Sequence, residues 1–387
     1  MSKEKLLAQV EAQQDHLFDL SCQIFDFNEA NGLEYKSSAL CADELEKLGF
    51  AVERGIGNQE TSFRAVWKNG EGGPNIGILG EYDALIGKGH GCGHHVQTPA
   101  AIGAVKAMQE VFAGTDVPMT LTVYGTPAEE TYGGKIIMQE AGCFTELDVV
   151  LGTHATRSRA YVGGSSMALN SYVVTWHGQS AHAAGCPWMG RSAMDAMLLT
   201  FQGLEFLREH VKDGTRIHYS IKEAIGPSNV VPQKACAGFT IRSHDNKYLP
   251  ELSERFLKVV EGACLMTETT YDMEKKPTYL ARKRNDTLAQ VAKANFEALG
   301  LTAADPIVVD SGGSTDFGNV SGIIPGCLVY LPYVNAPGHS DGWVAAGKAQ
   351  EARTLLLTST QMLACLMYDL VTNPEIIQKA KEEFDRG

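Results

Sequence analysis

The chain has 387 residues, of which 44% are hydrophobic and 20% are charged, and its formal net charge is -13. This length exceeds that of one ordinary core and predicts two domains. The acidic surplus is spread along the sequence, which argues against nucleic acid as a partner, and no apolar run near membrane-spanning length is evident, which argues against a membrane.

The first segment, MSKEKLLAQVEAQQDHLFDL, has the lysines of a signal sequence but lacks its apolar core. Its apolar residues instead recur at helical spacing, which predicts an amphipathic helix in a cytoplasmic protein. The nine cysteines are scattered rather than arranged as a disulfide framework, so we expect most of them to be reduced core residues.

Short apolar runs then alternate with helical stretches. The runs are NIGILG (75–80), MTLTVYG (119–125) and DVVLG (148–152). A helix is expected over 98–114, with Thr98 as its cap and Pro99 in its first turn. Strands that alternate with helices predict an α/β domain with a mostly parallel sheet covered on both faces.

From about Asn170 the pattern changes to half-exposed strands, SYVVTWHG and ACAGFTIRS, and amphipathic helices over 192–211 and 248–265. This β-α-β-β-α order predicts a small α+β domain on an antiparallel sheet. After Pro277 the α/β pattern returns, with a helix over 287–300, the strand CLVYLPY and a long C-terminal helix. We therefore predict one domain from 1–168 and 285–387, with an inserted domain over 169–284.

Ionisable residues follow several of the predicted strands. Ligands of open parallel sheets bind beyond the carboxyl ends of the strands, so these residues are expected on one rim. The residues concerned are Glu81, Asp83, Glu129, Glu130, His154 and His339.

Cys92 and His94 lie two residues apart in a glycine-rich loop. Thiolate and imidazole are preferred ligands of Zn²⁺. The adjacent Glu129 and Glu130 suit a division of labour, in which one carboxylate binds metal and the other acts on metal-activated water. Each signal alone has an ordinary structural explanation, such as a buried cysteine or a solvated helix start. Their joint position at strand ends favours a metal site.

Seven motifs resemble the aminoacylase and carboxypeptidase family of zinc metallopeptidases and amidohydrolases, in particular the amidohydrolase branch that includes aminobenzoyl-glutamate hydrolase, hippurate hydrolase and aminoacylase-like enzymes. They occur in the family's order over nearly the whole chain. The resemblance implies a catalytic domain of the zinc-exopeptidase type with an inserted lid and dimerisation domain. The motifs are GEYDAL…GCGHH, GTPAEE…GGK, GTHA, GQSAHAAGCPWMGRSAMDA, SNVVPQKACAGFTIR, GGSTDFGNVSGIIPG and APGHS.

The resemblance also implies roles for residues of the catalytic domain. Glu129 matches the general base, and Asp83 matches the carboxylate that orients a metal ligand. Cys92 stands where a ligand would bridge two ions. Zn²⁺ is expected, Mn²⁺ or Co²⁺ can substitute, and one or two ions per chain are implied. The implied metal ligands are Cys92, His94, Glu130, His154 and His339.

One residue departs from the family pattern. The Cys-Gly-His motif is commonly followed by Asp or Asn, whereas His95 follows here. This change is either tolerated behind the metal ligands or alters metal occupancy or substrate choice. Lys88 and His90, in the same loop, could reach the pocket mouth or be ordinary loop residues.

Three residues of the inserted domain complete the implied site. His182 matches a histidine that steadies the carbonyl oxyanion, commonly from the opposite subunit, which implies a homodimer. Asn229 and Arg242 match positions that hold a substrate carboxylate, which arginine can grip through two parallel hydrogen bonds. For Arg242, a surface salt bridge is the alternative.

The leading hypothesis is a metal-dependent amidohydrolase that cleaves N-acyl amino acids or small dipeptides with metal-activated water. One alternative is a cysteine hydrolase with Cys92 as nucleophile and His94 as base. Another is a binding protein of the same fold without catalysis. The acyl group and the amino acid of the substrate stay open.

Overall fold

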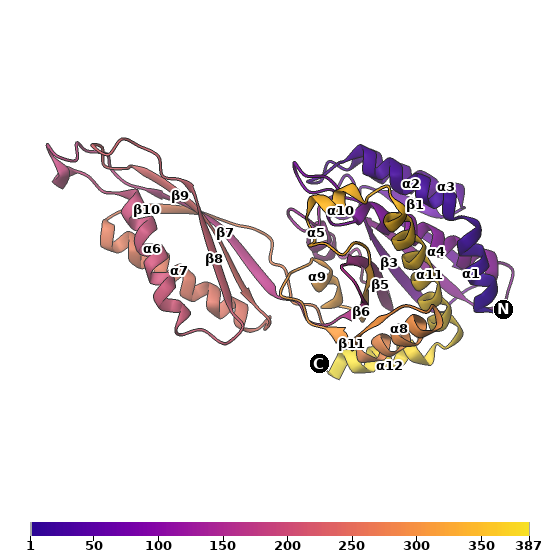
Figure 1. Cartoon of the computed structure of the whole chain (residues 1–387). Helices are drawn as coiled ribbons and strands as arrows, with labels where there is room; N and C mark the ends of the chain where they lie inside the picture. The colour runs from indigo at the N-terminus through magenta and orange to yellow at the C-terminus, as the bar shows by residue number, and fades with distance from the viewer. Residues whose placement is uncertain (1, 387) are drawn as a thin grey trace. The chain divides into compact units, whose positions relative to one another are not determined.

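The structure, a computed structural model, describes residues 2–386 and consists of two compact units (Figure 1). Unit 1 comprises the chain up to Ser165, Arg282–Ser311 and the chain from Thr315 onward. Unit 2 comprises Ser166–Ala281 and Gly312–Ser314. The long segment of unit 2 is therefore an insertion in the sequence of unit 1, and a second, three-residue segment joins it later in the chain.

Unit 1 is built on one large sheet in which β4, β3, β5 and β12 are neighbours and run parallel. The carboxyl ends of these four strands therefore share one rim, and the predicted α/β class with a mostly parallel sheet is confirmed. In sheet order the strands are β1 (Ala51–Arg54), β2 (Phe63–Asn69), β4 (Met119–Thr126), β3 (Asn75–Glu81), β5 (Val149–Thr156), β12 (Gly326–Pro332), β6 (Ala160–Gly163) and β11 (Ala303–Val309).

Helices cover both faces of this sheet (Figure 1). In β3, Ile76 and Ile78 point into the main core, whereas Leu79 joins a second cluster on the opposite face. Burial on both faces explains why the central strands are almost continuously apolar. The main core packs under α1 (Lys3–Ala12), α2 (Gln14–Phe27), α3 (Tyr35–Lys47), α4 (Gln97–Phe112), α8 (Asp286–Ala298), α11 (Gln350–Thr372) and α12 (Glu375–Arg386), and the second cluster packs under α5 (Gly134–Glu140) and α9 (Phe317–Ser321).

The start of α4 differs from the prediction. The short helix η2 (His94–Val96) runs directly into α4, so Val96 is the cap and Thr98 lies inside the first turn. The Thr98 hydroxyl donates to the backbone carbonyl of Glu81 at 3.0 Å instead of capping the helix. Pro99 does lie in the first turn, where its missing N–H costs no helical hydrogen bond.

One helix reaches membrane-spanning length, contrary to the prediction from the sequence. Among the described residues, α11 is long and apolar enough by length and composition alone. However, 67% of its most apolar window is buried inside the protein, and the helix packs in the main core. Such burial is typical of a helix in the core of a folded domain.

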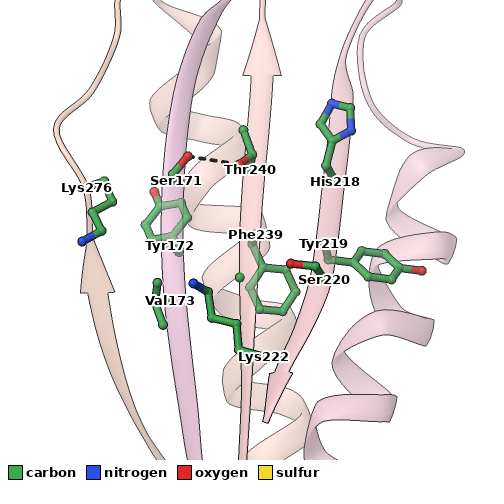
Figure 2. Close-up of a pocket in the computed structure, with 11 residues that line it drawn as sticks. Ser171, Tyr172, Val173, His218, Tyr219, Ser220, Lys222, Phe239, Thr240 and Lys276 are labelled. Atoms are coloured by element: carbon green, nitrogen blue, oxygen red, sulfur yellow. Dashed lines mark hydrogen bonds between the residues drawn. The ribbon is translucent and has the colours of Figure 1, made fainter. Parts of the chain in front are cut away.

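Unit 2 contains a second, antiparallel sheet in the order β10-β7-β9-β8. Its last strand, β10, was not predicted. Helices α6 and α7 cover one face, where Trp176, Phe239 and Phe256 are buried. The opposite face carries polar and small side chains around a shallow hollow of about 380 Å³ (Figure 2). The elements are β7 (Ala168–His177), α6 (Ala193–Arg208), β8 (Arg216–Glu223), β9 (Lys234–Ser243), α7 (Tyr248–Thr267) and β10 (Thr270–Lys275).

Candidate metal centre

Ionisable side chains come together at the carboxyl ends of β3, β4, β5 and β12, and His154 lies within the last residues of β5 itself. Glu129 and Glu130 follow β4 and are preceded by Ala128, a buried residue with a left-handed φ of 57°. His339 follows β12 and also has a left-handed φ, of 61°. A left-handed backbone is costly for residues with a Cβ and often marks a functional site.

The ligand atoms of the predicted residues form three overlapping groups in unit 1. Within each group all atoms lie within 4.8 Å of one another, the spread expected around a single cation. Cys92, His94 and Glu130 each belong to two of the groups, so these three residues link the groups to one another. The groups are Cys92, His94 and His154; Cys92, Glu130 and His339; and His94, Glu129 and Glu130.

Two buried polar atoms in these groups fit a cation. His94 Nε2 and Glu130 Oε1 make no hydrogen bond among the described residues. Charged groups do lie close to them, since His94 Nε2 is 3.1 Å from Glu81 Oε2 and Glu130 Oε1 is 3.4 Å from His339 Nε2. Burying such atoms without a hydrogen bond is costly, and a metal ion would satisfy both. The donor set of thiol, imidazole and carboxylate is also one that binds Zn²⁺.

Asp83 connects two of the candidate ligands. Its Oδ1 lies 2.8 Å from His94 Nδ1, and its Oδ2 accepts a hydrogen bond from the backbone N–H of Glu130 at 2.9 Å. The contact to Nδ1 leaves His94 Nε2 facing the candidate ion position. His154 is oriented in the same way, because its Nδ1 donates to the Ala155 carbonyl at 2.8 Å and its Nε2 lies 3.5 Å from Cys92 Sγ.

The two adjacent glutamates have different pKa values because their surroundings differ. Burial raises the pKa of Glu129 well above its ordinary value, and the carboxylates of Glu81 and Asp316 raise it further. Burial also acts on Glu130, but contacts with His339 and His94 outweigh it and lower the Glu130 pKa to about 2. Glu129 thus has the higher proton affinity and Glu130 stays ionised, as a metal ligand would.

A buried lysine beside the candidate centre was missed from the sequence. Lys135 Nζ lies 2.6 Å from Glu81 Oε1 and 2.6 Å from Asp316 Oδ1. Gln97 donates to Glu81 Oε2 at 2.7 Å. Carboxylate atoms of Glu81, Asp316 and Glu129 also lie within 4.8 Å of one another, so the ammonium supplies a resident positive charge to this acidic cluster.

The other notable residues of the cysteine loop lie outside the candidate centre. The buried His95 has its Nε2 2.9 Å from the Gly347 carbonyl and packs edge-on against Phe25. Burial lowers its pKa to about 4, so it is neutral at pH 7. His90 is buried against the Ile24 carbonyl, and Lys88 forms an exposed ion pair with Asp341.

The three remaining predicted residues lie in unit 2. His182 is exposed, and its Nδ1 accepts hydrogen bonds from the backbone N–H groups of Ala184 and Gly185. Its Nε2 therefore carries the proton of the neutral ring and can donate it to a ligand. Asn229 is paired with the same segment through its backbone, because its main-chain carbonyl accepts from the Ala183 N–H at 2.9 Å.

Arg242 is separated from that pair along the sheet. It lies near the end of β9, opposite Leu169 on β7, whereas His177 and Lys234 pair at the other end of the two strands. Arg242 Nη1 donates to Ser314 Oγ at 2.8 Å. The structure therefore brings His182 and Asn229 together but not Arg242.

Comparison with known proteins gives consistent results. The profile of Peptidase family M20/M25/M40 matches residues 79–344. Over 339 residues the chain is 34% identical to the Xaa-Arg dipeptidase of Mus musculus, covering 84% of this chain and 78% of the relative. It is 28% identical to one of the subunits of the p-aminobenzoyl-glutamate hydrolase of Escherichia coli (strain K12), covering 97% and 93%.

Solved structures share the fold. The Bacillus subtilis YXEP protein, described as a dinuclear metal binding peptidase, superposes with a TM-score of 0.71. The match covers 94% of this chain and 99% of that one at 19% sequence identity.

Proposed function

Since the chain belongs to peptidase family M20/M25/M40, and is a metal-dependent hydrolase of amide or peptide bonds, we propose that it cleaves N-acyl amino acids or small dipeptides at the centre described above. The observation that carries this proposal is the convergence of thiol, imidazole and carboxylate groups around two buried atoms that make no hydrogen bond within the described residues. The relatives named above act on a dipeptide and on an acylated glutamate, which supports this substrate class.

The residues proposed to hold one or two divalent cations, Zn²⁺ or alternatively Mn²⁺ or Co²⁺, are Cys92, His94, Glu130, His154 and His339. When bound, such a cation would polarise the scissile carbonyl and lower the pKa of a water molecule. Asp83 acts by positioning, because it contacts His94 and the Glu130 backbone together.

Glu129 is the proposed general base. It lies beside two candidate ligands, and its high proton affinity lets its carboxylate accept a proton from water. Glu129 then delivers this proton to the leaving nitrogen as the amide bond breaks. His182 Nε2 is the proposed donor to the carbonyl oxygen as negative charge develops there.

We further propose that His182 and Asn229 serve the site of a partner chain in a homodimer. From Lys234 to Arg242, β9 spans roughly 26 Å at about 3.3 Å per residue. The backbone of a dipeptide extends over at most about 7 Å, so one substrate cannot touch both ends of the sheet of a single chain. Trp188 and Met189 follow His182 in the same segment, and Ile225 shares a hollow with Val230, which pairs with His182. All three side chains are exposed, which supports a surface that a partner covers.

A cytoplasmic location is also proposed. All nine cysteines lie within the described part of the chain, and all are free. Free cysteines are the norm in a reducing compartment.

The proposal is tested by reconstituting the protein with Zn²⁺, Mn²⁺ or Co²⁺ and measuring amine release from N-acyl amino acids and dipeptides. Glu129→Gln should keep the metal content and the fold but lower kcat by at least about 10²-fold, the scale for loss of a general base. Near-normal turnover would refute the base assignment, whereas loss of metal would mean that Glu129 is a ligand.

The contact between Cys92 and His154 keeps a cysteine hydrolase as the alternative. Burial raises the pKa of the Cys92 thiol, which disfavours a free thiolate nucleophile. Chelator sensitivity combined with resistance of the metal-loaded protein to thiol alkylation supports the metal mechanism. The reverse pattern supports the alternative, and full metal loading without turnover of any substrate would support a binding protein.

A further inference from the structure

Two arginines and a histidine gather on the open face of the sheet in unit 2. Arg216 on β8 pairs directly with Arg242 on β9, and His218 pairs with Thr240. Directly paired residues of antiparallel strands project from the same face, so the two guanidinium groups and the imidazole share one surface. Figure 2 shows His218 on this face, near the hydrogen-bonded hydroxyls of Ser171 and Thr240.

This cluster of Arg216, His218 and Arg242 lacks a counter-charge. Within residues 2–386 none of the three forms an ion pair, and the nearby Arg208 is paired with Glu205. In the described part of the chain, the guanidinium groups of Arg242 and Arg216 donate only to neutral oxygens, those of Ser314 and Thr215. Partial burial lowers the pKa of His218, and the positive charges of Arg242, Arg208 and Arg216 lower it further.

Like charges placed directly opposite one another destabilise a sheet. A sheet that keeps two facing arginines and a histidine without an acidic partner is therefore suited to bind an anion from outside. A single carboxylate is already satisfied by one arginine through two parallel hydrogen bonds. The second arginine and the histidine are left for a second negative group.

We propose that the cluster binds a leaving amino acid with two carboxylates, glutamate or aspartate, and so makes the enzyme selective for N-acylated acidic amino acids. The inference rests on the proposed function, and it gives the α-carboxylate to Arg242, which the family resemblance marks as a residue that holds a substrate carboxylate. Arg216, assisted by His218, holds the side-chain carboxylate. The two carboxyl carbons of glutamate lie at most about 5 Å apart, given C–C bonds of about 1.5 Å, which matches the Cβ separation of about 5 Å between paired strand residues.

The test compares substrates that share one acyl group and carry glutamate, glutamine or arginine as the leaving amino acid. The metal-loaded enzyme should give a kcat/KM for the glutamate substrate at least about tenfold above that for glutamine, since a charge-assisted hydrogen bond discriminates on this scale. Arg216→Gln should lower this ratio of kcat/KM values to near one, chiefly by raising KM for the glutamate substrate.

Lys222→Gln is the matched control, because it removes one positive charge from the same strand. The Lys222 side chain lies over Gly238 on the open face and forms no ion pair in the described chain. This variant should keep the preference for glutamate. If both variants lost the preference for glutamate over glutamine equally, the preference would come from the overall positive charge of the sheet. That result would overturn the assignment of Arg216 to the side-chain carboxylate.

The other outcomes are equally decisive. Hydrolysis without preference for glutamate, or with preference for arginine, would overturn this inference and leave the proposed function intact. A glutamate preference that survives Arg216→Gln would overturn the role of Arg216. Failure to hydrolyse any N-acyl amino acid or dipeptide under all metals would instead remove the proposed function and this inference with it.

Discussion

Cys92 is one of three residues, with His94 and Glu130, that belong to two of the three ligand groups. His339 belongs to only one of them. The left-handed backbone at His339 is stabilised by its N–H, which donates to the Gly91 carbonyl at 2.9 Å and so ties this loop to the cysteine loop.

The two residues should therefore differ in their effects on metal content. We expect Cys92→Ala to lower the occupancy of every ion that the protein holds, and His339→Ala to lower that of one ion only. Elemental analysis after dialysis measures both, with Cys22→Ala as a control for loss of a half-buried thiol elsewhere. Full metal retention by Cys92→Ala would contradict its role as a shared ligand.

Glu34 predicts a pH dependence of stability. Burial and the charge of Asp83 raise its pKa from 4.5 to about 7, against the opposing hydrogen bonds from Gly32 and Thr61. A raised pKa in the folded state favours the protonated form, so stability from this group is complete below about pH 4.5 and is lost as the pH rises through 7. The loss amounts to at most about 3 kcal/mol of unfolding free energy.

Urea unfolding of the wild type and Glu34→Gln at pH 5 and pH 8, with equal metal loading, checks this expectation. The wild type should lose more stability than the variant between the two pH values, because glutamine cannot ionise. Parallel pH profiles would show that Glu34 does not titrate in this range.

At the scale of elements, Lys135 links α5 to β3 and to the start of α9 through Glu81 and Asp316. Lys135→Met should lower the unfolding free energy by about 3–5 kcal/mol, because it leaves two buried carboxylates without their cation. Urea unfolding measures the change. The exposed Lys293→Met is the control and should cost no more than about 0.5 kcal/mol. A loss for Lys135→Met as small as that of the control would contradict the structural role of the ion pairs.

The elements that the sequence predicts well are those whose pattern matches their burial. The central strands of unit 1 are continuously apolar because both faces are covered, and β7 and β9 alternate because one face is covered. β10, TYDMEK, was missed because this exposed edge strand is mostly polar. Thr98 was misread as a cap because the sequence does not reveal that η2 joins α4 without a break.

In the candidate site, too, some residues could be predicted from the sequence and others could not. The ligand-like residues could be found because the strand-end rule places them and their side chains are typical of metal centres. Lys135 and Asp316 could not, since their pairing joins segments 181 positions apart and lysine is not a metal ligand by type. The separation of His182 from Arg242 became evident only from the register of β7 and β9.

At the scale of the whole molecule, the proposed homodimer predicts that two inactive variants can complement each other. If His182 acts in the site of a partner, Glu129→Ala and His182→Ala chains should each be nearly inactive, yet recover activity when mixed under conditions of subunit exchange. Random exchange of equal amounts makes half the dimers mixed, and one of the two sites in each mixed dimer is intact. We therefore expect roughly a quarter of the wild-type activity.

Mass measurement of differently tagged chains establishes that mixed dimers form. Verified mixed dimers without recovered activity would place His182 in the site of its own chain. An active protein that stays monomeric would remove the dimer requirement itself.

The junction of the insertion has a consequence for how such a gene can change. The Arg282 Nε donates to the Gly164 carbonyl at 3.0 Å, so the chain leaves unit 1 and returns to it at almost the same point. The segment Ser166–Ala281 therefore begins and ends next to the same point of unit 1. Recombination could exchange it between genes, or replace it with a short linker, while the sheet of unit 1 stays joined.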